Sequence, residues 1–186
     1  MTRYSETPEH WIIVDRLADI ILRNVEGCIV DIGIGASTTI LAKHSVELNR
    51  RQYSCDQNGR NCRWAERELK TPIVYLGDSA DFIKQLSDIP IAIALLDASH
   101  VAARVMKDIE LILPKMNLFG VIFLHDTYPP MSKVTEDGSK CGHVYKARQE
   151  LEQDKLLQVF TWPYTAFGFG LTMIMKKAIN QPESRQ

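Results

Sequence analysis

The sequence lacks the features that would place it in several protein classes. Its 186 residues contain no apolar run near the roughly 20 residues that a membrane-spanning helix needs. Residues 1–8 have no apolar stretch followed by small cleavage residues, so no secretory signal is expected. The 22 lysines and arginines balance 23 aspartates and glutamates, which argues against a broad basic face for nucleic acid. We therefore expect neither a membrane nor a nucleic-acid partner.

Cysteine is also scarce. The four cysteines are Cys28, Cys55, Cys62 and Cys141, and none of them forms a C-x-x-C pair. This spacing argues against a zinc knuckle, and Cys28 and Cys55 lie in apolar segments where free cysteine behaves as a small hydrophobe. We predict reduced thiols and a cytoplasmic protein.

What is present is a repeated alternation of short apolar runs with helical patterns. The apolar runs at 28–33, 52–55, 73–76, 91–96 and 121–124 predict buried parallel strands, and the segments between them predict helices. Segments 157–161 and 170–175 predict a final antiparallel hairpin. The length suits one domain, and the pattern predicts an α/β fold: a three-layer, Rossmann-like, seven-stranded and mostly parallel sheet.

An acidic residue ends each of the five predicted parallel strands or lies in the turn after it. Ligands of open α/β sheets bind outside the carboxyl ends of the strands. Carboxylates also cap helices and fill turns, but five at matching positions are hard to explain by capping alone. They are Asp31, Asp56, Asp78, Asp97 and Asp126.

The turn after the first strand carries a glycine pair, Gly33 and Gly35, which permits a tight turn and a close backbone approach to a ligand. A nicotinamide-binding G-x-G-x-x-G/A turn would need a small residue where Thr38 stands. Asp56 lies about 20 residues further on, at the distance expected of an acid that accepts hydrogen bonds from ribose hydroxyls.

These motifs resemble those of the class I S-adenosylmethionine-dependent methyltransferases. The resemblance runs from about residue 27 to 126 and is strongest in Asp97-x-x-His100 and His125-Asp126, which are similar to a small-molecule O-methyltransferase branch. It departs from the family at Phe119, which replaces a glycine, and at Thr127, where the catechol-type enzymes carry a metal-binding asparagine.

The resemblance implies S-adenosylmethionine as cofactor and divides the single domain by role. Residues 1–26 form an N-terminal helix, 27–126 the cofactor-binding core, 127–142 a loop, and 143–177 a helix with the terminal hairpin. The expected cofactor residues are Asp31, Gly33, Gly35, Ser37, Thr38, Asp56, Gln57, Asp78, Ser79 and Asp97.

The expected chemistry lies after the fourth and fifth strands. Asp97 and Asp126 are candidate ligands of Mg²⁺. The alternative role for Asp97 is only to hold the ammonium group of the cofactor. His125 and His100 are candidate general bases, because an imidazole titrates near neutral pH. We expect His143 on the surface and His10 and His44 to be structural or exposed.

The remaining segments are expected to build the acceptor site. Trp11 is expected in the core, and the 162–164 segment is a lid candidate, with Tyr128 and Phe167 as further aromatic candidates. Three basic residues predict a solvated face or, alternatively, an anion site: Lys140, Lys146 and Arg148.

The sequence thus predicts an enzyme that methylates a small molecule, and the expected acceptor atom is a hydroxyl oxygen. Two alternatives stay open: a nicotinamide-dependent oxidoreductase, and a non-catalytic cofactor-binding module on the same scaffold. No separate substrate domain is expected, so either the acceptor pocket is open or a second subunit completes it in a homodimer.

Overall fold

The computed structural model of the protein describes residues 9–86, 89–136, 140–166 and 168–177. Seven strands form one sheet in the order β3-β2-β1-β4-β5-β7-β6. The strands are β1 (Cys28–Ile32), β2 (Gln52–Asp56), β3 (Ile73–Leu76), β4 (Ile91–Leu96), β5 (Met116–His125), β6 (Leu157–Trp162) and β7 (Leu171–Lys176). The first five pair in parallel, whereas β7 pairs antiparallel with both β5 and β6. The predicted mostly parallel sheet with a terminal hairpin at one edge is confirmed.

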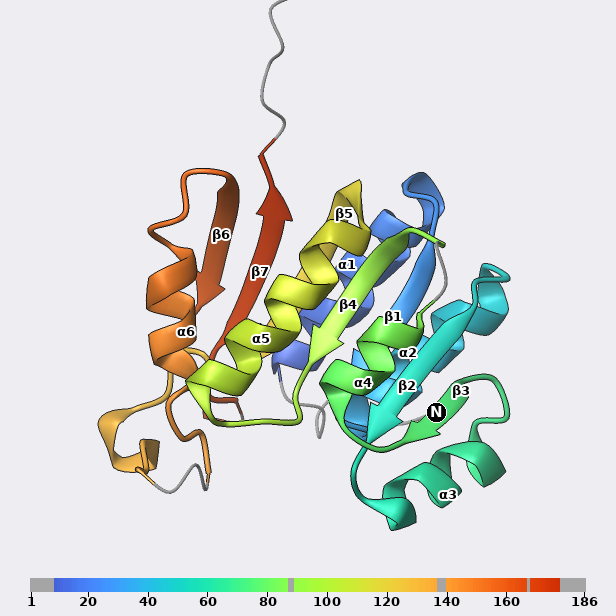
Figure 1. Cartoon of the computed structure of the whole chain (residues 1–186), viewed down its shortest axis with the longest axis horizontal. Coiled ribbons are helices and arrows are strands. Elements are labelled where there is room, and N and C mark those ends of the chain that lie inside the picture. Colours follow the sequence, from blue (N-terminus) through green and yellow to red (C-terminus); the bar gives the residue numbers. More distant parts are fainter. Residues whose placement is uncertain (1–8, 87–88, 137–139, 167, 178–186) are drawn as a thin grey trace, which may run out of the picture.

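Helices cover both faces of this sheet (Figure 1). They are α1 (Glu9–Asn24), α2 (Ala36–Glu47), α3 (Gly59–Glu68), α4 (Ser79–Gln85), α5 (Ala102–Ile112) and α6 (Val144–Leu151), with two short 3₁₀ turns at Leu113–Lys115 and Met131–Lys133. One apolar cluster joins α1 and α2 to the sheet, and another joins α4, α5 and α6 to the opposite face. None of the helices in the described part of the chain has the length and hydropathy to span a bilayer.

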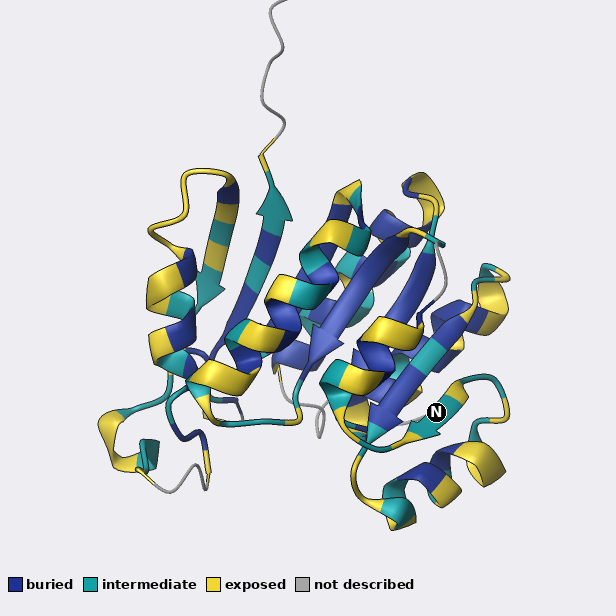
Figure 2. Cartoon of the chain, in the orientation of Figure 1, coloured by how far each residue is buried: buried dark blue, intermediate teal, exposed yellow. Residues whose placement is uncertain are grey.

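The central strands show why the sheet forms here. All five residues of β1 and all six of β4 are buried, as expected of parallel strands that are covered on both faces. Within β1, Ile29 packs toward α1 while Val30 and Ile32 pack toward α5, the period-two alternation of a strand. Figure 2 shows the burial falling from this centre toward β3 and β6 at the two edges. The carboxyl ends of the central strands are therefore held rigidly by the core.

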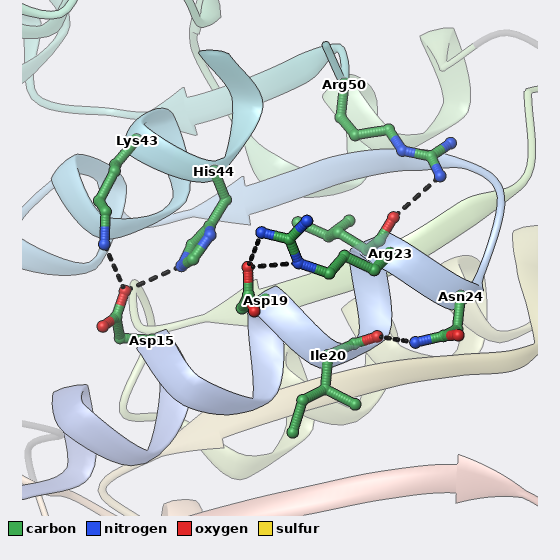
Figure 3. Close-up of polar contacts among 9 residues, drawn as sticks. Asp15, Asp19, Ile20, Arg23, Asn24, Lys43, His44 and Arg50 are labelled. Atoms are coloured by element: carbon green, nitrogen blue, oxygen red, sulfur yellow. Dashed lines mark hydrogen bonds and ion pairs between the residues drawn. The ribbon is translucent and has the colours of Figure 1, made fainter. Parts of the chain in front are cut away.

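Polar contacts anchor α1 to the elements around it (Figure 3). Asp15 lies 2.8 Å from Nε2 of the buried His44 and 3.5 Å from Nζ of Lys43, both on α2. The guanidinium of Arg50 donates to the carbonyl of Leu22 at 2.9 Å. His44 is thus structural, as expected, and α1 is a fixed part of the fold that can contribute side chains to a site.

Candidate active site

The turn after β1 brings two strand ends into contact. Gly33 has a φ of 102°, and a Cβ on it would lie 2.4 Å from the carbonyl oxygen of Asp97, so only glycine fits here. Its N–H donates to the carbonyl of Cys55 at 2.9 Å. Among the described residues, no atom beyond the two chain neighbours lies within 4 Å of the position that a Cβ would take on Gly35, which leaves that side of the turn open.

A buried network supports the turn from below. The Thr38 hydroxyl donates to Asp31 at 2.7 Å and accepts from the N–H of Gly35 at 2.9 Å. Ser54 and Ser37 also donate to Asp31, at 3.2 and 3.5 Å. Burial raises the pKa of Asp31 to about 7, although these hydroxyls oppose the shift. Asp31, Ser37 and Thr38 are all buried, so the structure places them beneath the turn, where they hold its shape.

Asp56, at the end of β2, also holds the glycine turn in place. Its carboxylate accepts from the N–H of Ile34 at 3.0 Å, the N–H of Asn58 at 2.7 Å and the side chain of Asn61 at 2.9 Å. It therefore links the glycine turn to the start of α3. Because a carboxylate has about four acceptor positions, it retains capacity toward a ligand.

A cavity of about 480 Å³ opens over these strand ends. We call it the strand-end cavity. Six of the ten predicted cofactor residues line it: Gly33, Gly35, Asp56, Gln57, Ser79 and Asp97. Asp78 does not line it, but caps α4 and accepts from the Gln57 side chain at 3.2 Å. The cavity is also lined by Asn58, Asn61, His100 and Arg104, of which only His100 was singled out from the sequence.

Next to this cavity, two carboxylates and two imidazoles come together. We call Asp97, His100, His125 and Asp126 the acid–histidine cluster. Nδ1 of His125 lies 3.1 Å from Asp126 and 3.3 Å from Asp97, and Nε2 of His100 lies 3.2 Å from Asp126. Asp126 adopts a left-handed φ of 59°, which non-glycine residues rarely take and which marks many functional sites.

The charges of this cluster depend strongly on one another. Burial alone would lower the pKa of His125, but the two carboxylates outweigh it and hold that pKa well above its usual range. Burial alone would raise the pKa of Asp126, but His100 and His125 outweigh it and lower the pKa to about 2. His125 therefore carries a proton here and balances the two carboxylates. It can act as a base only when another cation takes up their charge.

The donor set of the cluster suits a divalent cation. Ligand atoms of Asp97, His100 and Asp126 all lie within 4.8 Å of one another. Oδ1 of Asp126 is buried, and its ion pair with Nδ1 of His125 at 3.1 Å does not have hydrogen-bond geometry. Thr127, which stands in place of a metal-binding asparagine, is turned away: its hydroxyl accepts from Thr172 at 2.8 Å. Among the described residues, the third candidate ligand beside the two carboxylates is therefore His100, while His125 pairs with both of them.

Helix α1 supplies two residues that the sequence did not assign to the site. The ring of Trp11 stacks on His125 with centroids 4.5 Å apart and planes at 20°. His10 meets the edge of His125 at 5.7 Å, and its Nε2 lies 3.2 Å from the carbonyl of Pro163. Trp11 is buried as predicted, and His10 is structural rather than exposed. No local pattern signals these contacts, because His10 and Trp11 are more than 100 residues from His125 in the sequence.

A second cavity, of about 440 Å³, lies where the chain leaves β5, and its lining begins at Tyr128, two residues after Asp126. We call it the loop groove. It is lined by Tyr128, Pro129, Pro130, Met131, Val134, Tyr145, Arg148, Gln149 and Tyr164. Of the predicted aromatic wall, Tyr128 and Tyr164 are present here, Trp162 packs against the α1 cluster instead, and Phe167 lies outside the described residues.

The basic residues of this region behave differently from one another. Lys140 and Lys146 are exposed, as predicted for a solvated face. Arg148 is not: its side chain is 11% exposed, donates to the carbonyl of Thr127 at 3.1 Å and lies over the ring of Tyr128. The prediction of a solvated face is wrong for Arg148, because its guanidinium ties α6 to the end of β5. His143 is partly buried and pairs with Glu136 at 3.1 Å.

Comparisons with known proteins agree with this geometry. A family model described as a methyltransferase domain matches residues 30–127, which is more than half of the chain. No protein of curated function matches the sequence.

Solved structures share the fold at low identity. An O-methyltransferase from Bacillus cereus, solved with S-adenosylhomocysteine, is 16% identical with a TM-score of 0.71 over 92% of this chain and 82% of that one. An O-methyltransferase of tomaymycin synthesis from Streptomyces achromogenes, solved with S-adenosylmethionine, is 14% identical with a TM-score of 0.68 over 90% and 79%. An rRNA methylase from Streptococcus thermophilus is 15% identical with a TM-score of 0.59 over 95% and 98%. At such identities the likeness establishes the fold alone.

Proposed function

The chain belongs to the methyltransferase domain family and has the fold of the class I S-adenosylmethionine-dependent enzymes, and on this premise we propose that it methylates a hydroxyl group of a small-molecule acceptor. Family membership decides against the nicotinamide-dependent oxidoreductase. The acceptor and the chemistry that prepares it are argued below from the two cavities and the cluster between them.

The proposed cofactor site is the strand-end cavity. The open flank of Gly35 allows the methionine part of the cofactor to approach the backbone, and Asp56 retains acceptor capacity for ribose hydroxyls. The adenine is proposed to lie at the end of the next strand outward, β3, beside the turn that leads to Ser79. Methyl transfer from a sulfonium is an in-line displacement, so the main task of these residues is to hold the donor in a fixed orientation.

The proposed acceptor site is the loop groove. Its lining of three tyrosines, two prolines and a valine suits a small organic acceptor with an apolar or aromatic body. The near-zero net charge of the chain is also a poor match for nucleic-acid phosphates. These two observations favour a small molecule over an RNA, although an rRNA methylase shares the fold.

The acid–histidine cluster is proposed to prepare the acceptor hydroxyl. Asp97, His100 and Asp126 would hold a divalent cation, which lowers the proton affinity of a bound hydroxyl. Mg²⁺ is the ion expected from the sequence, but an imidazole ligand suits Mn²⁺ and other transition ions better, so metal identity is part of the test. His125, held by Trp11 and by the two carboxylates, keeps Asp97 and Asp126 at their positions.

The observation that carries the proposal is that Asp97 and His100 line the strand-end cavity and also reach Asp126. The cluster thus lies where a bound methyl donor and an acceptor would meet. The test has two stages. First, S-adenosylhomocysteine should raise the melting temperature, whereas NAD should leave it unchanged.

The second stage measures turnover with S-adenosylmethionine across a panel of phenols and hydroxylated small molecules, with EDTA, Mg²⁺ or Mn²⁺. Turnover that EDTA abolishes and a divalent ion restores supports the cation site. Turnover that EDTA leaves unchanged would assign deprotonation to His100 instead. Cofactor binding without turnover on any hydroxyl would overturn the proposed reaction, and methylation of RNA would replace the acceptor.

The proposed compartment follows from the thiols. Cys28, Cys55, Cys62 and Cys141 are all free and buried in this structure. This is what a protein of the reducing cytoplasm would show, and it supports the proposal that the enzyme works there.

A further inference from the structure

Asp108 is a buried carboxylate for which the proposed mechanism has no use. It lies on the otherwise apolar inner face of α5, beside Val105, Ile109 and Ile112, and is 4% exposed. Its one hydrogen-bonding partner in the described residues is Ser79, whose hydroxyl lies 2.8 Å from both carboxylate oxygens. Ser79 in turn lines the strand-end cavity.

The direction of this hydrogen bond is set by chemistry. An ionised carboxylate only accepts hydrogen bonds, so the single hydrogen of the Ser79 hydroxyl must point toward Asp108. The hydroxyl then has only lone pairs to offer a ligand. A ligand group that meets this hydroxyl must therefore be a hydrogen-bond donor, because an acceptor there would face lone pairs and find no hydrogen.

The carboxylate at position 108 is ionised under the conditions that matter for binding. Burial raises the pKa of Asp108 to about 6, with Asp78 adding to the rise and with Ser79 and Arg104 opposing it. At neutral pH the acceptor-only form is thus the populated one. A neutral asparagine could fill the same space without the cost of burying a charge, so packing alone does not account for a carboxylate here.

We propose that Asp108 acts through Ser79 to select the 6-amino group of the cofactor's adenine against a 6-oxo group. This inference rests on the proposed function, which places ribose at Asp56 on β2 and the base at the next strand outward, β3, where Ser79 follows. Asp108 is a positioning residue that touches no ligand. A serine hydroxyl can both donate and accept a hydrogen bond, but with its hydrogen held by Asp108 it can only accept one from a ligand. The amine of adenine is a hydrogen-bond donor of the required kind.

The experiment compares three nucleoside ligands by isothermal titration calorimetry at neutral pH: S-adenosylhomocysteine, S-inosylhomocysteine and the analogue with unsubstituted purine. The wild type should prefer S-adenosylhomocysteine to each of the other two by about tenfold, since a lost partner leaves a polar group unsatisfied. Asp108→Asn provides an amide donor to Ser79 and frees its hydrogen, so the preference over the inosine ligand should fall to about threefold or less. Ser79→Ala should reduce the preference similarly.

The control is Asp81→Asn, which removes an exposed carboxylate on the same helix, α4, and should leave the ratios unchanged. The ratio of affinities is the decisive readout, because a purely structural role for Asp108 would weaken all three ligands by one factor. Equal weakening in Asp108→Asn, or a wild type without preference, would overturn the inference while the proposed function stands. Failure of the wild type to bind S-adenosylhomocysteine would overturn both.

Discussion

The two halves of the active site differ in how far the protein satisfies its own polar groups. At the ends of β1 and β2, the carboxylates of Asp31 and Asp56 each accept three hydrogen bonds from neighbouring groups. At the ends of β4 and β5, both ring nitrogens of His125 and one oxygen of Asp126 are buried without a hydrogen-bond partner among the described residues. The first half is therefore saturated with internal hydrogen bonds, whereas the second half pairs its charges without completing their hydrogen bonds.

The difference indicates which half of the proposed site is rigid. A preformed turn suits a cofactor whose shape does not vary, and the glycine turn is held by hydrogen bonds from Thr38 below it and Asp56 beside it. In the proposed reaction the acceptor side releases and receives protons, and its groups have unused hydrogen-bonding capacity for this. The following predictions test this division, beginning with the largest expected effect.

If the two halves of the site are separate, removing a carboxylate of the acid–histidine cluster should leave cofactor binding nearly unchanged. Asp126→Ala should reduce turnover by roughly a hundredfold to a thousandfold, because the acceptor hydroxyl loses the groups that prepare it. The dissociation constant for S-adenosylhomocysteine should change less than about threefold. Parallel kinetics and calorimetry measure this, with Asp81→Asn as an exposed control. Equal losses in binding and turnover would show that the halves are not separate.

The converse change tests the cofactor half. Asp56→Ala should weaken S-adenosylhomocysteine by roughly tenfold to a hundredfold, since it removes charged hydrogen bonds and releases Ile34 and Asn61 from the turn. Turnover at saturating cofactor should fall far less. Calorimetry against full kinetic curves separates the two effects. An unchanged dissociation constant would remove Asp56 from the proposed cofactor site.

A pair of glycine variants sharpens the account of the turn. Gly33→Ala should lower the free energy of unfolding by about 1–3 kcal/mol, because it strains a positive φ and drives a Cβ against Asp97. Gly35→Ala has open space and should cost well under 1 kcal/mol while still weakening cofactor binding. Chemical denaturation and calorimetry on both variants provide the check. Equal destabilisation by the two changes would contradict the structure.

The last prediction concerns the pH dependence of the buried network under the turn. Because the pKa of Asp31 is about 7 in the fold, and near 4 in an unfolded chain, the native state binds more protons between these values. Its contribution to stability is therefore complete below about pH 4 and is lost as the pH rises toward 7, with a slope of at most roughly 1.4 kcal/mol per pH unit. Asp31→Asn should flatten this part of the pH profile in urea unfolding. An identical profile in the variant would show that Asp31 is not protonated there.

The positions of the strands along the chain and the residues at their ends could be predicted because local patterns carry them. The fully apolar run from Ile91 to Leu96 and the acid that follows it are visible without any knowledge of distant contacts. The strand β5 was predicted too short, from residue 121, because Met116–Gly120 mixes polar and apolar residues and joins the sheet only through an irregular pairing with β4. Local pattern does not signal such a pairing.

The site was predictable only in part, for the same reason. The acids and histidines after β4 and β5 share one edge of the sheet by topology, and that much follows from the strand pattern. The stack of Trp11 on His125 and the tie from Arg148 to Thr127 depend on how separate helices dock. Ser79 was expected as a cofactor residue, but its hydrogen bond to Asp108 depends on how α4 docks on α5.

Asp97 belongs to both halves, since it lines the strand-end cavity and joins the acid–histidine cluster, while its backbone lies against Gly33. A residue shared in this way makes the two binding equilibria interdependent. Whatever factor the first ligand imposes on the affinity of the second is, by thermodynamic reciprocity, the factor that the second imposes on the first. In the proposed site, the contact between Gly33 and Asp97 is therefore the place where binding of the cofactor and binding of the acceptor would affect each other.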